Sequence, residues 1–163
     1  MALYKAGTEI GTNIVDIWRL NSTQSMSSGE ATIDTSWTRT TNRGRVPEGN
    51  AMTESSGIFT FPSTGKWLVI SNFYQSGSAA THWKGIKLKN ADDETLQMSY
   101  SHGDSSGSNH DHSHVALHTF LDVTDTTSNA CKVKFVAHGG ATTTWVGGDD
   151  GASIVLFLRL MGT

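Results

Sequence analysis

Apolar and polar side chains alternate along two stretches in the second half of the chain. Between His114 and Val123, one set of alternate positions is largely apolar: Val115, Leu117, Leu121 and Val123. The other set is mixed: His114, Ala116, His118, Phe120 and Asp122. Because successive side chains of a strand point to opposite faces, this pattern predicts a half-buried strand. Residues Cys131 to His138 alternate in the same way, which predicts a second such strand.

Two other segments are apolar on both faces. Lys66 to Tyr74 carries apolar side chains at both odd and even positions, and so does Ile154 to Met161 apart from Arg159. Antiparallel strands with both faces covered lie in the middle of a sandwich or against another subunit. These two segments therefore give the first indication that the chain forms an oligomer.

The segment from Asn13 to Leu20 fits two periodicities. Ile10, Ile14, Ile17 and Trp18 have helical spacing, but the residues from Asn13 onward also alternate as a strand would. We favour the extended interpretation.

Turn sequences separate the predicted strands at short and regular distances. Pro62 to Gly65, Asn90 to Asp93 and Gly147 to Gly151 are rich in the residues that turns prefer. Strands with such punctuation predict an all-β fold, an antiparallel β-sandwich with jelly-roll topology. We assign an N-terminal strand, arm and loop to residues 1–30 and the jelly-roll domain to 31–163, within a single globular domain overall.

Composition narrows the classes of function. The chain has 163 residues, a formal net charge of -3 and 17% charged residues. This balance argues against a nucleic-acid partner, and the lack of a long apolar run argues against membrane insertion. A single cysteine, Cys131, excludes an internal disulfide framework, and we expect it to pack as a small hydrophobe on the inward face.

One segment resembles the central motif of the complement globular-head and tumour-necrosis-factor (TNF) jelly rolls. Gly57 to Ile70 contains a Gly-x-Phe strand, a Pro-x-x-Gly turn and then an aromatic-rich strand. Ala152 to Leu160 resembles the closing strand of the same family. The resemblance implies a TNF-like fold and a homotrimer, in which sister subunits cover part of each sheet.

A pair of motifs also resembles short structural proteins of tailed phages, especially marine and cyanobacterial ones. The motifs are Asp16-Ile17-Trp18-Arg19-Leu20 and the segment from Ser56 to Gly65. This resemblance implies a virion protein, assembled in the host cytoplasm, that decorates the capsid or forms a tail appendage. Its partners would be its own copies and other capsid or tail proteins, and it would not be an enzyme.

Aromatic residues are expected in the core or in the trimer interface, because interface residues are apolar, aromatic or small. The sequence does not decide between the two locations for these five: Trp83, Tyr100, Phe120, Trp145 and Phe157.

The histidine-rich segment is the clearest candidate for metal chemistry. On an extended backbone, His110, His112 and His114 point to one side, which suits a divalent metal such as zinc. A threefold axis could also bring one histidine from each subunit to a single ion, and the histidines could respond to pH. The alternative is a solvated polar loop. No other cofactor is expected.

Other candidates follow from Trp, Arg and acidic residues. Trp37, Trp83 and Trp145 could stack on sugars, which favours a rival function, a carbohydrate- or receptor-binding module for host adsorption. Arg39, Arg43 and Arg45 could contact an acidic partner or a host-surface glycan beside Trp37.

Acidic turns at Asp92 to Glu94 and Asp149 to Asp150 could bind calcium. A hydrolase would need a Gly-x-Ser-x-Gly elbow or a glutamate beside the histidines, and neither is present.

Overall fold

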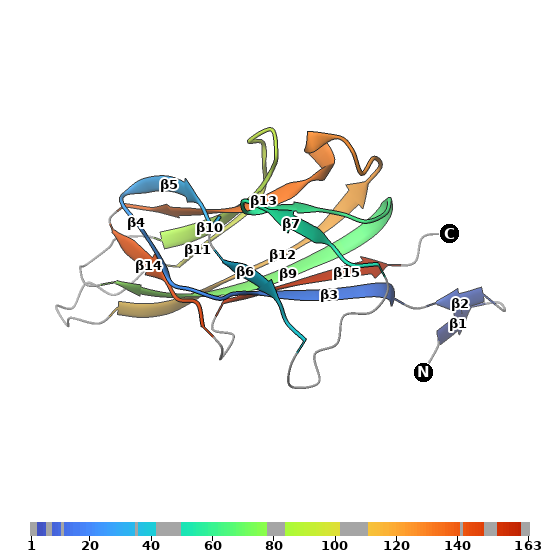
Figure 1. The fold of residues 1–163 in the computed structure, drawn as a ribbon, viewed down its shortest axis with the longest axis horizontal. Coiled ribbons are helices and arrows are strands. Elements are labelled where there is room, and N and C mark those ends of the chain that lie inside the picture. The colour runs from blue at the N-terminus through green and yellow to red at the C-terminus, as the bar shows by residue number, and fades with distance from the viewer. Residues whose placement is uncertain are drawn as a thin grey trace.

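The computed structural model describes residues 3–5, 8–10, 12–34, 36–41, 50–77, 84–101, 111–140, 142–148 and 153–160. For residues 3–13, 77, 111, 112 and 143 within these ranges, only the backbone is described. These residues form an all-β structure of two packed antiparallel sheets (Figure 1), as the alternating pattern predicted. None of the described residues forms a helix long and apolar enough to cross a membrane.

The larger sheet has seven strands. In spatial order, six of them are β4 (Gln24–Met26), β14 (Thr143–Trp145), β9 (Gly65–Gly77), β15 (Ile154–Leu160), β3 (Thr12–Leu20) and β6 (Trp37–Arg39). The seventh, β12 (Asp111–Val123), pairs with β9 along the whole of that strand. The pairing of β3 with β15 and β6 confirms the extended interpretation of this segment.

The second sheet has six strands. Its order is β11 (Thr95–Ser101), β10 (Lys84–Asn90), β13 (Val133–Gly139), β8 (Ile58–Thr60) and β7 (Thr53–Ser55), with β5 (Gly29–Thr32) also paired to β13. A 3-10 turn, η1 (Asn129–Cys131), precedes β13. A separate hairpin of β1 (Leu3–Lys5) and β2 (Thr8–Ile10) lies beyond the end of the sandwich (Figure 1).

Inward-facing aromatic rings fill the space between the two sheets. Phe59 on β8 lies at the centre of this cluster, with ring centroids 5.4 Å from Trp18, 5.2 Å from Trp37 and 5.1 Å from Phe157. Such edge-on and tilted pairs add stability beyond the apolar area that they bury. The Gly-x-Phe strand of the resemblance therefore supplies a central residue of the core.

The two strands predicted from alternation differ in how well their burial pattern was predicted. β12 has buried Val115 and Leu117 on one face and exposed His118 on the other, as predicted. In β13, by contrast, Lys134 and Val136 are buried as well, because this strand lies inside its sheet between β10 on one side and β5 and β8 on the other.

Cys131 does not lie on the strand that alternation predicted. It ends η1, ahead of β13, and its side chain is partly buried. The helical turn replaces the first residues of the expected strand because the Ser128 side chain accepts a hydrogen bond from the backbone N–H of Ala130 and caps it.

Candidate assembly face

Four neighbouring strands of the larger sheet present their outward side chains on one continuous surface. We call this surface the outer apolar face and define it by Val15, Ile17, Leu68, Ile70, Tyr74, Phe120, Ile154, Leu156 and Leu158. These side chains alternate with the buried core residues on β3, β9, β12 and β15, so they point away from the second sheet.

Strand register aligns these residues in rows across the sheet. In one row, Leu158 lies opposite Val15 on one side and Leu68 on the other, and Leu68 lies opposite Phe120. Side chains directly opposite each other on antiparallel strands contact one another on the same face. The rows therefore make one apolar surface that extends over four strands.

A parallel row contains a histidine at its end. Leu156 lies opposite Ile17 and Ile70, and Ile70 lies opposite His118 on β12. His118 is exposed, whereas Ile70 and Leu156 are half-buried. Sequence analysis placed His118 on the mixed face of its strand and assigned it to no site, because alternation within one strand does not show which strand lies beside it.

Phe120 is the most exposed large apolar side chain among the described residues. Phe120 is 71% exposed, compared with 44% for Met98 and 43% for Tyr100. A contiguous exposed apolar surface on a soluble protein marks a site of interaction with another molecule. The outer apolar face is therefore the strongest candidate for a functional surface.

Charged side chains lie at the margins of this face. At one end, Lys66 pairs with Asp122. On β3, the Arg19 side chain is buried and donates to the carbonyl oxygen of Gly148 at 3.0 Å. Interface centres are depleted in charge in the same way, with charged groups at the rim.

The predicted metal-binding histidines are only partly described. His114 is exposed, and its ring lies against that of Tyr74 on β9, with centroids 4.9 Å apart. His112 lies two residues earlier on β12 and is described by its backbone, and His110 lies outside the described residues. Within the part of the chain that is described, no three His, Cys, Asp or Glu side chains gather as metal ligands.

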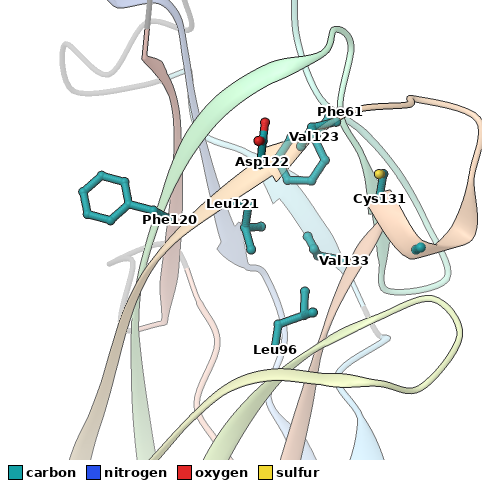
Figure 2. A pocket seen from close by; sticks show the side chains of 9 residues that line it. Phe61, Leu96, Phe120, Leu121, Asp122, Val123, Cys131 and Val133 are labelled. Carbon is teal, nitrogen blue, oxygen red and sulfur yellow. The ribbon is translucent and has the colours of Figure 1, made fainter. Parts of the chain in front are cut away.

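A pocket of about 220 Å³ lies near the end of β12, and Phe120 and Asp122 are among the residues that line it, although the Phe120 ring points away from the other lining side chains (Figure 2). Leu121, Val123, Val133, Leu96 and Phe61 contribute to its lining, and so does Cys131. Burial raises the pKa of the Cys131 thiol, but backbone hydrogen bonds from Asp125 and Thr124 outweigh this effect, and the pKa is lowered. The Cys131 side chain thus lines this pocket and packs, partly buried, against the edge of the core.

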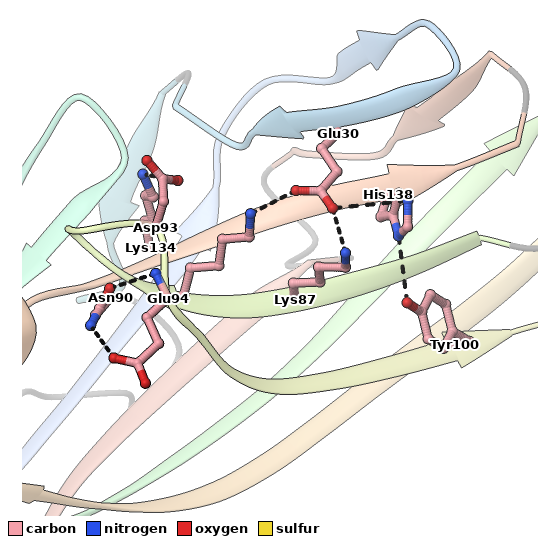
Figure 3. Close-up of polar contacts among 9 residues, drawn as sticks. Glu30, Lys87, Asn90, Asp93, Glu94, Tyr100, Lys134 and His138 are labelled. Atoms are coloured by element: carbon pink, nitrogen blue, oxygen red, sulfur yellow. Dashed lines mark hydrogen bonds and ion pairs between the residues drawn. The ribbon is translucent and has the colours of Figure 1, made fainter.

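The outer face of the six-stranded sheet has a different chemistry. Glu30 on β5 forms ion pairs with Lys87 and Lys89 of β10, and Tyr100 contacts His138 (Figure 3). Hydrogen bonds from Lys87 and Lys89 lower the pKa of Glu30 from 4.5 to about 2. Burial, followed by the charge of Lys87, lowers the pKa of His138. This surface is polar and charge-paired, unlike the outer apolar face.

The five predicted core or interface aromatics fall into distinct groups. Trp145 and Phe157 are fully buried in the core, while Phe120 and Tyr100 are exposed on opposite sheets. Trp83 lies outside the described residues. Phe120 is thus the member of this set that lies on the outer apolar face.

Trp37 and Arg39 do not form an exposed contact site. Trp37 is buried and donates from Nε1 to the carbonyl oxygen of Ile33 at 2.8 Å, so its ring has no free surface for a sugar. Arg39 pairs with buried Asp16 at 2.9 Å and lies over the Trp18 ring. Arg43 and Arg45 lie outside the described residues.

The acidic turn at Asp92 to Glu94 makes internal contacts. Asp93 pairs with Lys134 at 2.8 Å, and this hydrogen bond lowers the pKa of Asp93. Glu94 accepts a hydrogen bond from the Asn90 side chain at 3.2 Å. Two carboxylates of the predicted calcium site are thus held by neighbouring side chains, and Asp149 and Asp150 lie outside the described residues.

Known proteins resemble this chain in structure rather than in sequence. No protein-family model matches the chain, and no curated protein matches it. Eiger TNF from S. frugiperda is similar with a TM-score of 0.67 at 16% identity, over 92% of this chain and 94% of that one. Murine APRIL at pH 8.0 gives 0.62 at 12% identity, over 90% and 98%.

PRD1 vertex protein P5 is also similar, with a TM-score of 0.58 at 10% identity over 93% of this chain and 99% of that one. Identities this low establish a shared fold and leave the activity open. With its two antiparallel sheets and these neighbours, the protein has a TNF-like jelly-roll fold.

Proposed function

We propose that this protein is a non-enzymatic structural component of a phage virion, assembled as a homotrimer through its outer apolar face. Within the virion it would decorate the capsid or form part of a tail appendage, in contact with other capsid or tail proteins. The observation that carries the proposal is the four-strand apolar surface bounded by Lys66, Asp122 and Arg19.

Self-association removes this surface from water. Burying apolar area contributes about 25 cal/mol per Å², and nine outward apolar side chains on one face would supply a large part of an interface. In a trimer the contact would be heterologous, with the β12 side of the face in one copy against the β3 side in the next. Heterologous contacts close into a ring when the rotation between copies permits it, and a trimer is such a ring.

The similarity to PRD1 vertex protein P5 supports a structural role in a phage particle. The similarity to TNF proteins supports the same fold, and the sequence resemblance implied a trimer for it. The paired motifs that contain Asp16 and Gly57 suggested the virion on independent grounds.

The proposed virion role is tested on purified particles. Mass spectrometry of the particles should detect this chain as a stoichiometric component, and a reconstruction should show threefold density for it. Absence of the chain from particles of a phage that encodes it would contradict the proposal.

The proposed interface is tested with a pair of variants. Leu156→Lys introduces a charge in the middle of the outer apolar face and should yield folded monomers. Met98→Lys introduces the same charge at a 44% exposed position on the other sheet and should remain a trimer. Equal oligomeric states for both variants would contradict the assignment of the interface to this face.

A second candidate function is a receptor- or glycan-binding module, and one feature of the structure favours it. The Tyr100 ring lies over Gly85, so close that a Cβ atom at position 85 would lie 2.3 Å from the ring. Tyr100 is 43% exposed. An exposed ring beside polar groups suits stacking on a sugar. Loss of glycan-array binding in Tyr100→Ala, with retention in Met98→Ala, would favour this function, and no binding by the wild type would exclude it.

A further inference from the structure

His118 lies on β12, at the end of a row of the outer apolar face that is otherwise apolar. Ile70 lies directly opposite it on β9, and Leu156 lies beyond Ile70 in the same row. Along β12, the nearest outward neighbours are Ala116 and Phe120. Any molecule that covers this row must therefore remove an imidazole from water together with apolar side chains.

The other titratable and charged groups of these strands lie at a distance from His118 in register or have partners. On β12 and β9, His114 stacks on Tyr74 and Asp122 pairs with Lys66. On β3 and β15, Arg19 donates to Gly148 O and Arg159 donates to Thr64 O. Asp16 of β3 is buried and pairs with Arg39, and Asp111 and His112, at the start of β12, are described by their backbone. Among the described residues, no carboxylate forms a hydrogen bond or ion pair with His118.

We propose that His118 makes self-assembly of this protein acid-sensitive, so that the trimer holds at neutral pH and dissociates in mild acid. This inference rests on the proposed trimer and adds its regulation. A neutral imidazole can enter an apolar interface at small cost, whereas an imidazolium without a counter-charge is strongly disfavoured there.

The sign of the pH dependence follows from this difference. Assembly favours the neutral form of His118, because only that form enters the apolar interface without burying an unpaired charge. The contribution to assembly is fully present above the ordinary histidine pKa of about 6.5 and is lost as the pH falls below it. With three copies of His118 in each trimer, the association constant would fall by up to about 10³-fold per pH unit.

The test is sedimentation velocity of the full chain at about pH 7.5 and about pH 5.5, where an ordinary histidine changes charge. The wild type should be a trimer at the higher pH and dissociate at the lower. His118→Gln keeps a polar side chain that cannot titrate, and it should remain a trimer at both. His138→Gln removes a histidine from the outer face of the other sheet, and it should behave as the wild type does.

The possible results separate this inference from the proposed function. A wild type that remains trimeric at the lower pH would overturn the inference, and so would a His118→Gln variant that dissociates as the wild type does. A wild type that is monomeric at the higher pH would instead contradict the trimer itself. Far-UV circular dichroism at both pH values confirms that the separated chains remain folded, since His118 is exposed and its replacement leaves the core intact.

Discussion

A single buried carboxylate connects three segments of the chain. Asp16 on β3 is fully buried and accepts hydrogen bonds from Trp18 Nε1 at 3.0 Å, Arg39 Nε at 2.9 Å and Met52 N at 2.8 Å. The Trp18 contact joins two residues of the Asp-x-Trp-Arg motif, whereas Arg19 of that motif donates to Gly148 O. The other two contacts of Asp16 hold the chain on both sides of residues 42–49, because Arg39 precedes that segment and Met52 follows it.

Asp16→Asn should therefore destabilise the protein by about 3 kcal/mol, because it leaves the Arg39 charge without its partner. Urea unfolding at neutral pH measures the change. The matched control is Asp122→Asn, which removes an exposed ion pair with Lys66 and should change the free energy of unfolding by about 0.5 kcal/mol or less. Equal effects of the two substitutions would show that Asp16 does not have this role.

Glu30 should contribute to stability at neutral pH and lose that contribution in acid. Its pKa is lowered to about 2 in the folded state from 4.5, so the contribution is present above about pH 4.5 and is lost toward about pH 2. The Glu30 side chain is 35% exposed, so solvent screening limits the effect to about 1 kcal/mol.

The test introduces Glu30→Gln into the Leu156→Lys variant, so that assembly does not contribute to the measured stability. The free energy of unfolding should then fall less steeply as the pH is lowered into the acid range. Urea midpoints between about pH 5 and about pH 2 measure this pH dependence. An unchanged pH dependence would show that the contacts with Lys87 and Lys89 carry no net energy.

At the scale of elements, the tight turn between β7 and β8 depends on glycine. Gly57 has φ +79°, and a Cβ atom there would lie 2.7 Å from the carbonyl oxygen of Ile33. This requirement explains the glycine of the Gly-x-Phe motif in physical terms. Phe59, two residues later, can then enter the centre of the core.

Gly57→Ala should destabilise the protein by about 2 kcal/mol or more, because it combines backbone strain with a collision. Gly29→Ala is the matched control, since Gly29 also has a positive φ, +108°, but no atom within 4 Å of the added Cβ. Thermal unfolding of both variants isolates the collision. A larger loss for Gly29→Ala would contradict this account of the turn.

The burial pattern of a strand was predicted correctly where burial follows the type of side chain. The prediction was wrong where neighbouring strands determine which side chains are buried. β12 is an alternating strand because its outer face lacks a covering layer in the monomer. β13 has the same alternation in sequence, yet Lys134 is buried because β13 is an interior strand and Asp93 neutralises the charge. Trp37 likewise was predicted as a residue that could stack on sugars, and only the pairing of β6 with β3 places it in the core.

At the scale of the whole molecule, the sequence predicted an apolar surface beyond the core without locating it. The segments from Lys66 to Tyr74 and from Ile154 to Met161 are apolar on both faces in the sequence, which indicated an oligomer. The order of strands, with β15 between β9 and β3, was needed to bring their outward side chains together. Long-range pairing of this kind leaves no local pattern in a sequence, so His118 and Phe120 could not be joined to Ile70 and Leu68 beforehand.

The proposed homotrimer is best tested by the native mass of the wild-type protein, measured by native mass spectrometry at neutral pH and low micromolar concentration. The outer apolar face predicts a complex of three chains as the dominant species. A predominantly monomeric protein under these conditions would contradict the account, because a four-strand apolar surface would then remain open to water.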